Sequence, residues 1–287
     1  MRFPFRRSRP EIKSVDELRL MRRAGLVVAR ALEAVGAAVC PGISTAELDA
    51  IAAEVIKSAG ALPSFLGYGA TKDRPGFTGV CCLSVNEEIV HGIPGDRRLV
   101  DGDLISIDCG AIVDGWHGDA AITVGVGTVN GDQRRLSEAT RSAMWHGIVA
   151  ARLGGRVTDI SAAIEARVDQ LEVDHDRRYG IVEEFVGHGI GSAMHQEPDV
   201  PNAGRAGRGP VIIPGLALAI EPMLTLGEPD NHLLDDGWTA ITDDRSPAAH
   251  TEHTITVTEQ GIWVLTAEDG GESELAALGA PFGPLAD

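Results

Sequence analysis

Residues 101–119 read DGDLISIDCGAIVDGWHGD, and this stretch predicts a β-hairpin that carries an aspartate on each strand. A first Asp-Gly turn opens it, an apolar strand ends on Asp108, and a second Asp-Gly turn at Asp114 leads back to Asp119. Because side chains alternate along a strand with a period of two, the hairpin can return Asp119 beside Asp108. Such a pair either holds a divalent cation or consists of two solvated turn residues. The stretch alone leaves both interpretations open.

The composition is that of a globular protein with a sizeable core, since 44% of the 287 residues are hydrophobic and 23% are charged. The net charge of −17 argues against a general nucleic-acid binder and favours attraction of cations. The four cysteines form no CxxC motif and no disulfide-like spacing, which indicates reduced thiols in a cytoplasmic protein. No apolar run is typical of a signal peptide or a membrane span, so we expect no membrane attachment.

Composition divides the chain into three parts. Residues 1–13 form a basic arm with arginines at positions 2, 6, 7 and 9, which we expect to be mobile. Residues 14–266 are predicted to form one folded domain. Residues 267–287 are acidic and rich in Gly, Ala and Pro, without a hydrophobic period, and we expect them to be a disordered tail.

The two halves of the chain resemble each other. Residues 102–108 and 215–221 each combine a glycine turn, an apolar strand and a terminal carboxylate. The tripeptide His-Gly-Ile occurs at 91–93 and again at 188–190, and a pair of predicted helices precedes the strands of each half. Matches in the same order indicate an internal duplication, with two α/β halves around a pseudo-twofold axis. The carboxylates that end equivalent strands are then expected to meet at the centre.

Several acids and histidines stand at predicted strand ends or in glycine-rich turns. They are His91, Asp108, Asp119, His188, His195, Glu221 and Glu252. A buried cluster of carboxylates needs a compensating cation, and four carboxylates with one neutral imidazole suit two divalent ions such as Mn, Fe(II) or Co. Of the other six histidines, His146, His175, His232 and His250 are interpreted as surface or packing residues.

Short segments along the chain resemble one known family. They are SVNEEIVHGIP at 84–94, the Asp108 and Asp119 pair, GHGIG at 187–191, IEPM at 220–223 and EHTI at 252–255. Together, over about residues 12–265, they resemble the type I, bacterial-type methionine aminopeptidases. The resemblance implies an α+β "pita-bread" fold, in which two pseudo-symmetric α/β halves surround a central antiparallel sheet, and a single catalytic domain over residues 14–266.

The resemblance also implies a metal centre. The ligands would be Asp108, Asp119, His188, Glu221 and Glu252, holding two divalent ions such as Co, Mn or Fe, with Asp119 and Glu252 bridging the ions. A water bridging the ions would attack the first peptide bond, and Glu221 would accept its proton.

Further residues would contact the substrate. By the same resemblance, His195 would hydrogen-bond the substrate carbonyl or its oxyanion, and His91 would contact the substrate amide or the leaving nitrogen. The pocket for the first side chain would include Phe77, Cys82, Met194 and Trp238, whose soft walls suit a thioether. Three positions depart from the family. Met194 replaces a frequent Phe, residues 71–76 lack the usual tyrosines, and Gly110 replaces a common Thr.

The implied function is removal of the initiator methionine from nascent proteins, with a preference for a small second residue. The partners would be nascent N-termini, and we expect a monomer. The arginine arm is either a solvated terminus or an electrostatic tether to ribosomal RNA. Two rivals stay open, which are a proline-specific aminopeptidase or prolidase of the same fold, and a non-catalytic binding protein built on it.

Overall fold

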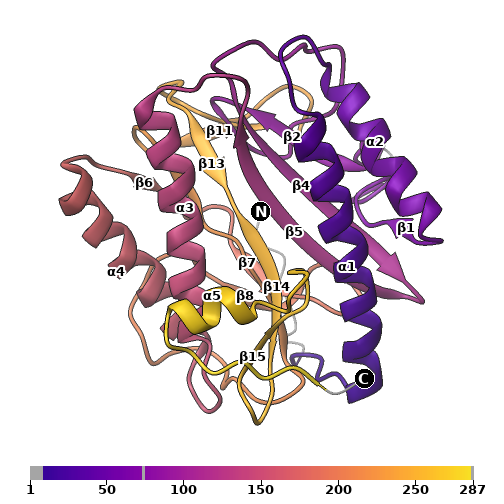
Figure 1. The fold of residues 1–287 in the computed structure, drawn as a ribbon, viewed down its shortest axis with the longest axis vertical. Helices are drawn as coiled ribbons and strands as arrows, with labels where there is room; N and C mark the ends of the chain where they lie inside the picture. Colours follow the sequence, from indigo (N-terminus) through magenta and orange to yellow (C-terminus); the bar gives the residue numbers. More distant parts are fainter. Residues whose placement is uncertain (1–8, 73–74, 286–287) are drawn as a thin grey trace.

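The computed structural model describes residues 9–72 and 75–285 (Figure 1). Within this part the helices are α1 (Val15–Ala38), α2 (Thr45–Ser58), α3 (Gly131–Ala150), α4 (Val157–His175) and α5 (Glu272–Ala277). The strands are β1 (Leu62–Pro63), β2 (Cys81–Val85), β3 (Glu88–Val90), β4 (Leu104–Val113), β5 (Trp116–Gly125), β6 (Gly180–Ile181), β7 (Gly187–Gly189), β8 (Gln196–Val200), β9 (Ala217–Ile220), β10 (Met223–Thr225), β11 (Asn231–Leu233), β12 (Ala240–Thr242), β13 (Ala248–His250), β14 (Glu252–Val257) and β15 (Ile262–Val264).

The first two helices begin where the sequence offers capping boxes. Ser14 and Glu17 satisfy each other's backbone N–H groups at the start of α1, and Ser44 and Glu47 do the same for α2. Both helices bury an apolar face against the sheet. Among the described helices, none has the length and apolarity that crossing a membrane requires.

A nine-stranded antiparallel sheet forms the centre of the molecule, in the order β1-β4-β5-β14-β9-β7-β8, with β2 paired to β4 and β15 to β14. Helices α1 and α2 pack with β2, β4 and β5 in one core, and α3 and α4 pack with β9 and β14 in another. Figure 1 shows the two helix pairs over opposite halves of the sheet. The predicted α+β fold with two halves around a central antiparallel sheet is confirmed.

The two halves also enter the sheet in the same way. Gly102 precedes β4 with φ +93°, and Gly215 precedes β9 with φ +85°. Both values lie in the left-handed region, where glycine avoids the steric penalty of a side chain. The matching turns therefore bring β4 and β9 into the sheet at corresponding places, as the internal duplication predicted.

The ends of the chain differ from the expectation. Residues 1–8 of the predicted arm lie outside the described residues, but Ile12 forms a β-bridge with Leu216 and Lys13 donates a backbone hydrogen bond to Gly215. Residues 11–13 are therefore fixed to the domain, and their assignment to a mobile arm is wrong.

The prediction of a disordered tail is also wrong for the described residues up to 285. Helix α5 inserts Leu275 into the core of the second half, where it is fully buried. Phe282 then forms a bridge beside Ile262 of β15. One buried leucine on a six-residue helix gives no detectable hydrophobic period, so local pattern could not reveal this segment.

Candidate metal centre

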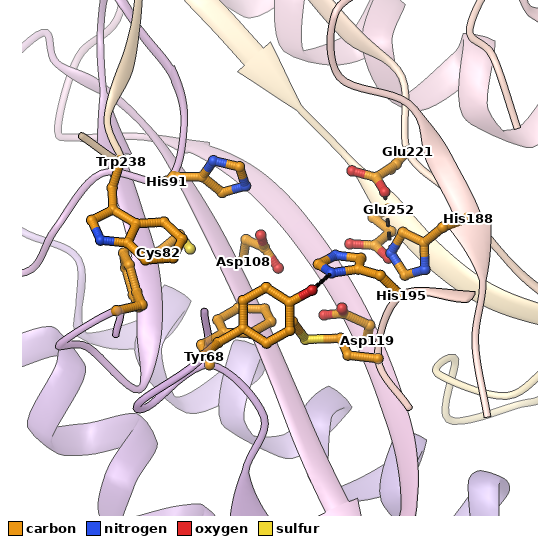
Figure 2. A pocket seen from close by; sticks show the side chains of 13 residues that line it. Tyr68, Cys82, His91, Asp108, Asp119, His188, His195, Glu221, Trp238 and Glu252 are labelled. Carbon is orange, nitrogen blue, oxygen red and sulfur yellow. Dashed lines mark hydrogen bonds and ion pairs between the residues drawn. The ribbon is translucent and has the colours of Figure 1, made fainter. Parts of the chain in front are cut away.

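The predicted metal ligands lie on strands that are neighbours in the central sheet. Asp108 is on β4, Asp119 is on β5, and Glu252 begins β14. Glu221 directly follows β9, and His188 lies in β7. Because these strands stand in the order β4-β5-β14-β9-β7, all five side chains reach one pocket (Figure 2).

The small residue Ala121 lies between two of the carboxylates. Ala121 on β5 pairs with Asp108 on one side and with Glu252 on the other. Residues of such a cross-strand row point to the same face of the sheet, and Asp119, two residues before Ala121, shares this face. The partner of Asp119 itself is Gly110. The predicted hairpin is confirmed, with Asp119 diagonal to Asp108 rather than directly opposite it.

The acidic side chains are buried without enough partners. Asp119 and Glu252 are 3% and 2% exposed. Among the described residues, no hydrogen-bond partner is found for Asp108 Oδ1, Asp119 Oδ1 or Glu252 Oε1. An unpaired buried polar atom costs about 1–3 kcal/mol, and a charged one costs more. The described side chains that line the pocket include no lysine or arginine that could neutralise the cluster.

Burial and mutual repulsion raise the pKa values of these carboxyls. Burial first, and the charge of Asp119 second, raises the pKa of Asp108 well above its usual range. The pKa values of Asp119 and Glu252 are raised well above theirs by burial first and by neighbouring carboxylates second. Burial raises the pKa of Glu221 to about 8. A divalent cation would offset both the cost of burying these charges and the repulsion between them, so these residues fit a bound metal.

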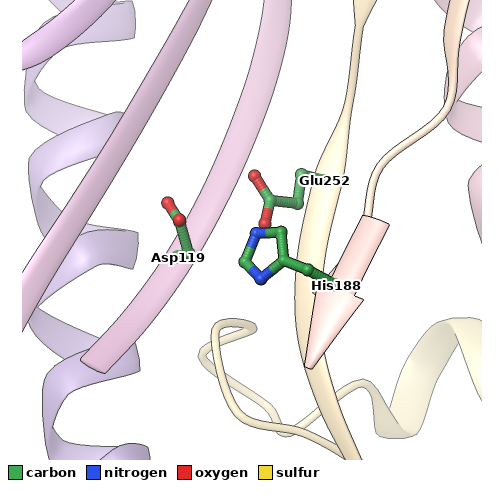
Figure 3. Close-up of side chains that lie close together, drawn as sticks. All are labelled: Asp119, His188 and Glu252. Atoms are coloured by element: carbon green, nitrogen blue, oxygen red, sulfur yellow. The ribbon is translucent and has the colours of Figure 1, made fainter. Parts of the chain in front are cut away.

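His188 presents its ring nitrogen Nε2 to this cluster. Its Nδ1 lies 2.9 Å from the carbonyl oxygen of Gly189, which can only accept, so Nδ1–H donates and the Nε2 lone pair is left for a metal. Burial, followed by neighbouring His195, lowers the pKa of His188 to about 3 and keeps the ring neutral. Ligand atoms of Asp119, His188 and Glu252 all lie within 4.8 Å of one another (Figure 3).

Glu221 lies between two histidines. Its Oε1 is 3.4 Å from His188 Nε2, and its Oε2 is 3.4 Å from His250 Nε2. Ligand atoms of Glu221, His250 and Glu252 form a second group within 4.8 Å. The interpretation of His250 as a surface or packing residue missed this contact. Its position two residues before Glu252 in the sequence was the available signal, although the two residues lie on the successive strands β13 and β14.

An apolar wall lies opposite the carboxylates. It consists of Phe65, Phe77, Cys82, Met194 and Trp238. Phe77 and Trp238 meet edge to face with ring centroids 5.5 Å apart. Figure 2 shows Cys82 and Trp238 on the side of the pocket away from Glu221 and Glu252. The cavity of about 100 Å³ suits a single side chain, since sites for drug-sized ligands measure about 300–1,000 Å³.

The structure brings the four predicted pocket residues together and adds Phe65 and Tyr68 from the preceding loop. The aromatic residues of this glycine-rich loop predicted either a packed connection or a pocket wall, and these two were not assigned to the site from sequence. A Cβ at Gly110 would lie 2.7 Å from Ser64 and 3.0 Å from the Phe65 ring. Gly110, where the family commonly has Thr, therefore leaves room for the Phe65 ring to pack over the sheet.

Both predicted substrate histidines line the pocket. The hydroxyl of Tyr68 forms a hydrogen bond with His195 Nδ1, and burial raises the pKa of Tyr68, so the hydroxyl keeps its proton. With this hydroxyl as the donor to Nδ1, neutral His195 carries its ring proton on Nε2. His91 follows β3 with φ +61°, and its ring meets Phe185 with centroids 5.5 Å apart. Burial is the main cause that lowers the pKa of His91 to about 4, so this ring is neutral as well.

Comparison with known families gives one model that covers most of the chain. The model of metallopeptidase family M24 matches residues 19–259. This range contains all five candidate ligands and both candidate substrate histidines.

Named relatives agree with that match. The chain is 51% identical to a protein named methionine aminopeptidase 1 from Mycobacterium tuberculosis, over 88% of this chain and 94% of the relative. It resembles the crystal structure of methionine aminopeptidase from Thermotoga maritima with a TM-score of 0.85 and 37% identity, covering 91% of this chain and all of the other. Prolidase from Pyrococcus furiosus, at 21% identity and a TM-score of 0.68, shares the fold, and 65% of its length is covered.

Proposed function

Since this chain belongs to the type I methionine aminopeptidases of metallopeptidase family M24, we propose that it removes the N-terminal methionine of nascent polypeptides at the centre described above. The observation that carries the proposal is the cluster of buried, partly unpaired carboxylates that faces an apolar pocket sized for one side chain. All five candidate ligands line this pocket, and its walls suit an unbranched thioether.

The cofactor of the proposal is a pair of divalent ions. Asp108, Asp119, His188, Glu221 and Glu252 would hold them, and oxygen-rich ligands with imidazole suit Mn, Fe(II) or Co. When bound, such ions polarise the scissile carbonyl and make water acidic enough to supply hydroxide near neutral pH.

Residues of the chain would handle the proton and the oxyanion. Glu221 is the proposed proton acceptor, because its carboxylate lies in the pocket beside the other candidate ligands. His195 Nε2–H is free to donate to the carbonyl oxygen, since Tyr68 already occupies Nδ1. His91 would contact the nitrogen of the cleaved bond.

The remaining pocket contacts would select the substrate. Phe77, Cys82, Met194 and Trp238 would surround the methionine side chain. Burial, and next the charge of Asp108, raises the pKa of the Cys82 thiol, so this wall stays uncharged. We base the preference for a small second residue on the family resemblance and on the bulk of His91 packed against Phe185.

The biological setting is part of the same proposal. Nascent N-termini arise in the cytoplasm, and we place the protein there as a monomer. The arginines of residues 1–8 would attract ribosomal RNA by charge, which would bring the enzyme close to its substrates.

The test is hydrolysis of Met-Ala-Ser and Ala-Pro-Ala by metal-stripped protein to which Mn(II), Co(II) or Fe(II) is returned. Release of methionine only with metal, and its loss in Asp108→Asn, is the expected result. Cleavage of Ala-Pro-Ala instead would assign a proline-specific activity. Bound metal without turnover of either peptide would indicate a non-catalytic protein.

A further inference from the structure

We propose that His250 is a sixth protein ligand of the metal centre, so that the centre has an imidazole on each side of Glu221. The proposal rests on the metal centre of the proposed function and extends its ligand set. The family resemblance gave this histidine no role. The assignment rests on the geometry around its Nε2 atom.

The ring of His250 is buried and has an unused nitrogen. The residue is 1% exposed, and Nε2 has no hydrogen-bond partner among the described residues. Glu221 Oε2 lies 3.4 Å from this atom but does not form a hydrogen bond with it. A buried ring nitrogen without a partner is costly unless something outside the polypeptide binds it.

The same contact occurs at an expected ligand. His188 Nε2 lies 3.4 Å from Glu221 Oε1, the same separation that His250 Nε2 has from Oε2. Metal–ligand bonds to imidazole nitrogen and carboxylate oxygen are about 2.0–2.2 Å long, so neighbouring ligand atoms around one ion are roughly 3.0–3.5 Å apart. The separation of each histidine Nε2 from a Glu221 oxygen therefore matches the separation expected for two ligand atoms on the same ion.

Two groups of ligand atoms lie close together at this centre, in addition to Asp108. One contains Asp119, His188 and Glu252, and the other contains Glu221, His250 and Glu252, each within 4.8 Å. Glu252 belongs to both, as a bridging ligand must. Each group then has one neutral nitrogen donor beside its carboxylates, a combination that favours Mn, Fe(II), Co or Zn over Mg.

The backbone of His250 is fixed by the strands that carry two of the ligands. Its N–H donates to Ser106 Oγ at 3.2 Å and to Thr123 Oγ1 at 3.0 Å, and Thr123 Oγ1 donates to its carbonyl oxygen at 2.6 Å. Ser106 lies two residues before Asp108 on β4, and Thr123 lies on β5. The hairpin with the aspartates thus also determines where the His250 ring stands.

The decisive variant is His250→Gln, compared with wild type and with His146→Gln. Glutamine can still donate a hydrogen bond to Glu221, but its amide is a much poorer ligand than imidazole for Co(II). His146 lies on α3 and contacts the carbonyl of Ser142, away from the pocket, which makes the same substitution there a matched control.

Co(II) binding to metal-stripped protein is measured by calorimetric titration. In His250→Gln we expect one of the two binding steps to weaken on the order of 10-fold or more, by analogy with the 10–100-fold losses at supporting residues. The other step should stay within about twofold, and His146→Gln should match wild type. Two unchanged steps in His250→Gln would overturn the inference, since the residue would then act by hydrogen bonding or packing alone.

A second measurement needs no variant. In the proton NMR spectrum of wild-type protein with two equivalents of Co(II), each ligating imidazole gives one strongly shifted, solvent-exchangeable N–H signal. Two such signals support the inference, and one signal, from His188 alone, contradicts it. If wild-type protein binds no Co(II) at all, the proposed function fails instead, so the two failures are distinguishable.

Discussion

Asp108 and Glu252 face each other across one residue, because both pair with Ala121 on the strand between them. The alanine methyl is the smallest side chain that keeps a regular strand, and it leaves the space between the carboxylates open. The first prediction concerns this residue.

Ala121→Val should reduce metal binding. The added methyl groups would enter the space between Asp108 and Glu252 and overpack the sheet, at a cost of about 1–3 kcal/mol. Metal content after loading with Co(II), together with the melting temperature, checks this. Ala111→Val is the matched control, because Ala111 is buried in the α1 and α2 core and should lose stability but keep its metal. Full metal content in Ala121→Val would show that the space is not where the ions bind.

Asp108→Asn should have opposite effects on metal-free and metal-loaded protein. Without metal, removing one of the crowded carboxyls relieves burial and repulsion, the causes that raise the pKa of Asp108. A gain of about 1 kcal/mol would raise the melting temperature by about 2–4 °C. With Mn(II) added, the variant should gain much less stability than wild type and should not release methionine. A lower melting temperature in the presence of chelator would contradict this account.

The stability of the metal-free protein should fall as pH rises from 6.5 to 8. Glu221 has its pKa raised from 4.5 to about 8, so its stabilising contribution is complete below pH 4.5 and is lost as pH rises through 8. The pKa values of His188 and His250 are lowered from 6.5 to about 3, so their contributions are already complete above pH 6.5.

Thermal unfolding in chelator at pH 6.5, 7.25 and 8 measures this trend. Protein saturated with Mn(II) is the control and should show a much flatter dependence, since the ion replaces the protons. A metal-free melting temperature that rises with pH over this range would show that the carboxyls are already ionised there.

Tyr68→Phe should lower kcat while leaving KM nearly unchanged. The phenylalanine ring keeps the pocket wall but loses the hydrogen bond to His195 Nδ1, so that the donor nitrogen is no longer specified. We expect a loss of about 10-fold, smaller than the roughly 10²–10³-fold typical of removing an oxyanion donor, as His195→Ala would. Kinetics with Met-Ala-Ser measure both. In the His195→Ala background, Tyr68→Phe should have no further effect on kcat. An additive loss of kcat would show that Tyr68 does not act through His195.

Deletion of residues 1–10 should reduce co-sedimentation with ribosomes at low salt. The deletion removes the arginines at positions 2, 6, 7 and 9 from a protein whose net charge is strongly negative. Cleavage of a tripeptide should remain as in the full chain, because Glu11 and the residues after it are kept. Unchanged sedimentation would leave the arm without this role.

Local pattern determined much of this protein. The turn glycines and alternating strands of residues 101–119 predict the hairpin, and the repeat at residues 215–221 predicts its counterpart in the second half. Ser14 and Glu17 mark the start of α1 by the chemistry of unpaired N–H groups. The residue types at strand ends identified the candidate acids and histidines that the sheet brings to one pocket. These features depend on neighbours in sequence, so the sequence alone can specify them.

Only the tertiary structure decided how the distant pieces meet. The sharing of Ala121 by Asp108 and Glu252 depends on which strands pair and in which register, and a shift of one residue would reverse every side chain. The contacts of His250 with Glu221 and of Tyr68 with His195 join segments far apart in sequence. The burial of Leu275 could not be predicted from sequence for the same reason, because its site in the core forms only when α3 packs on the sheet. Such contacts follow from burial and packing of the whole chain, which no local period records.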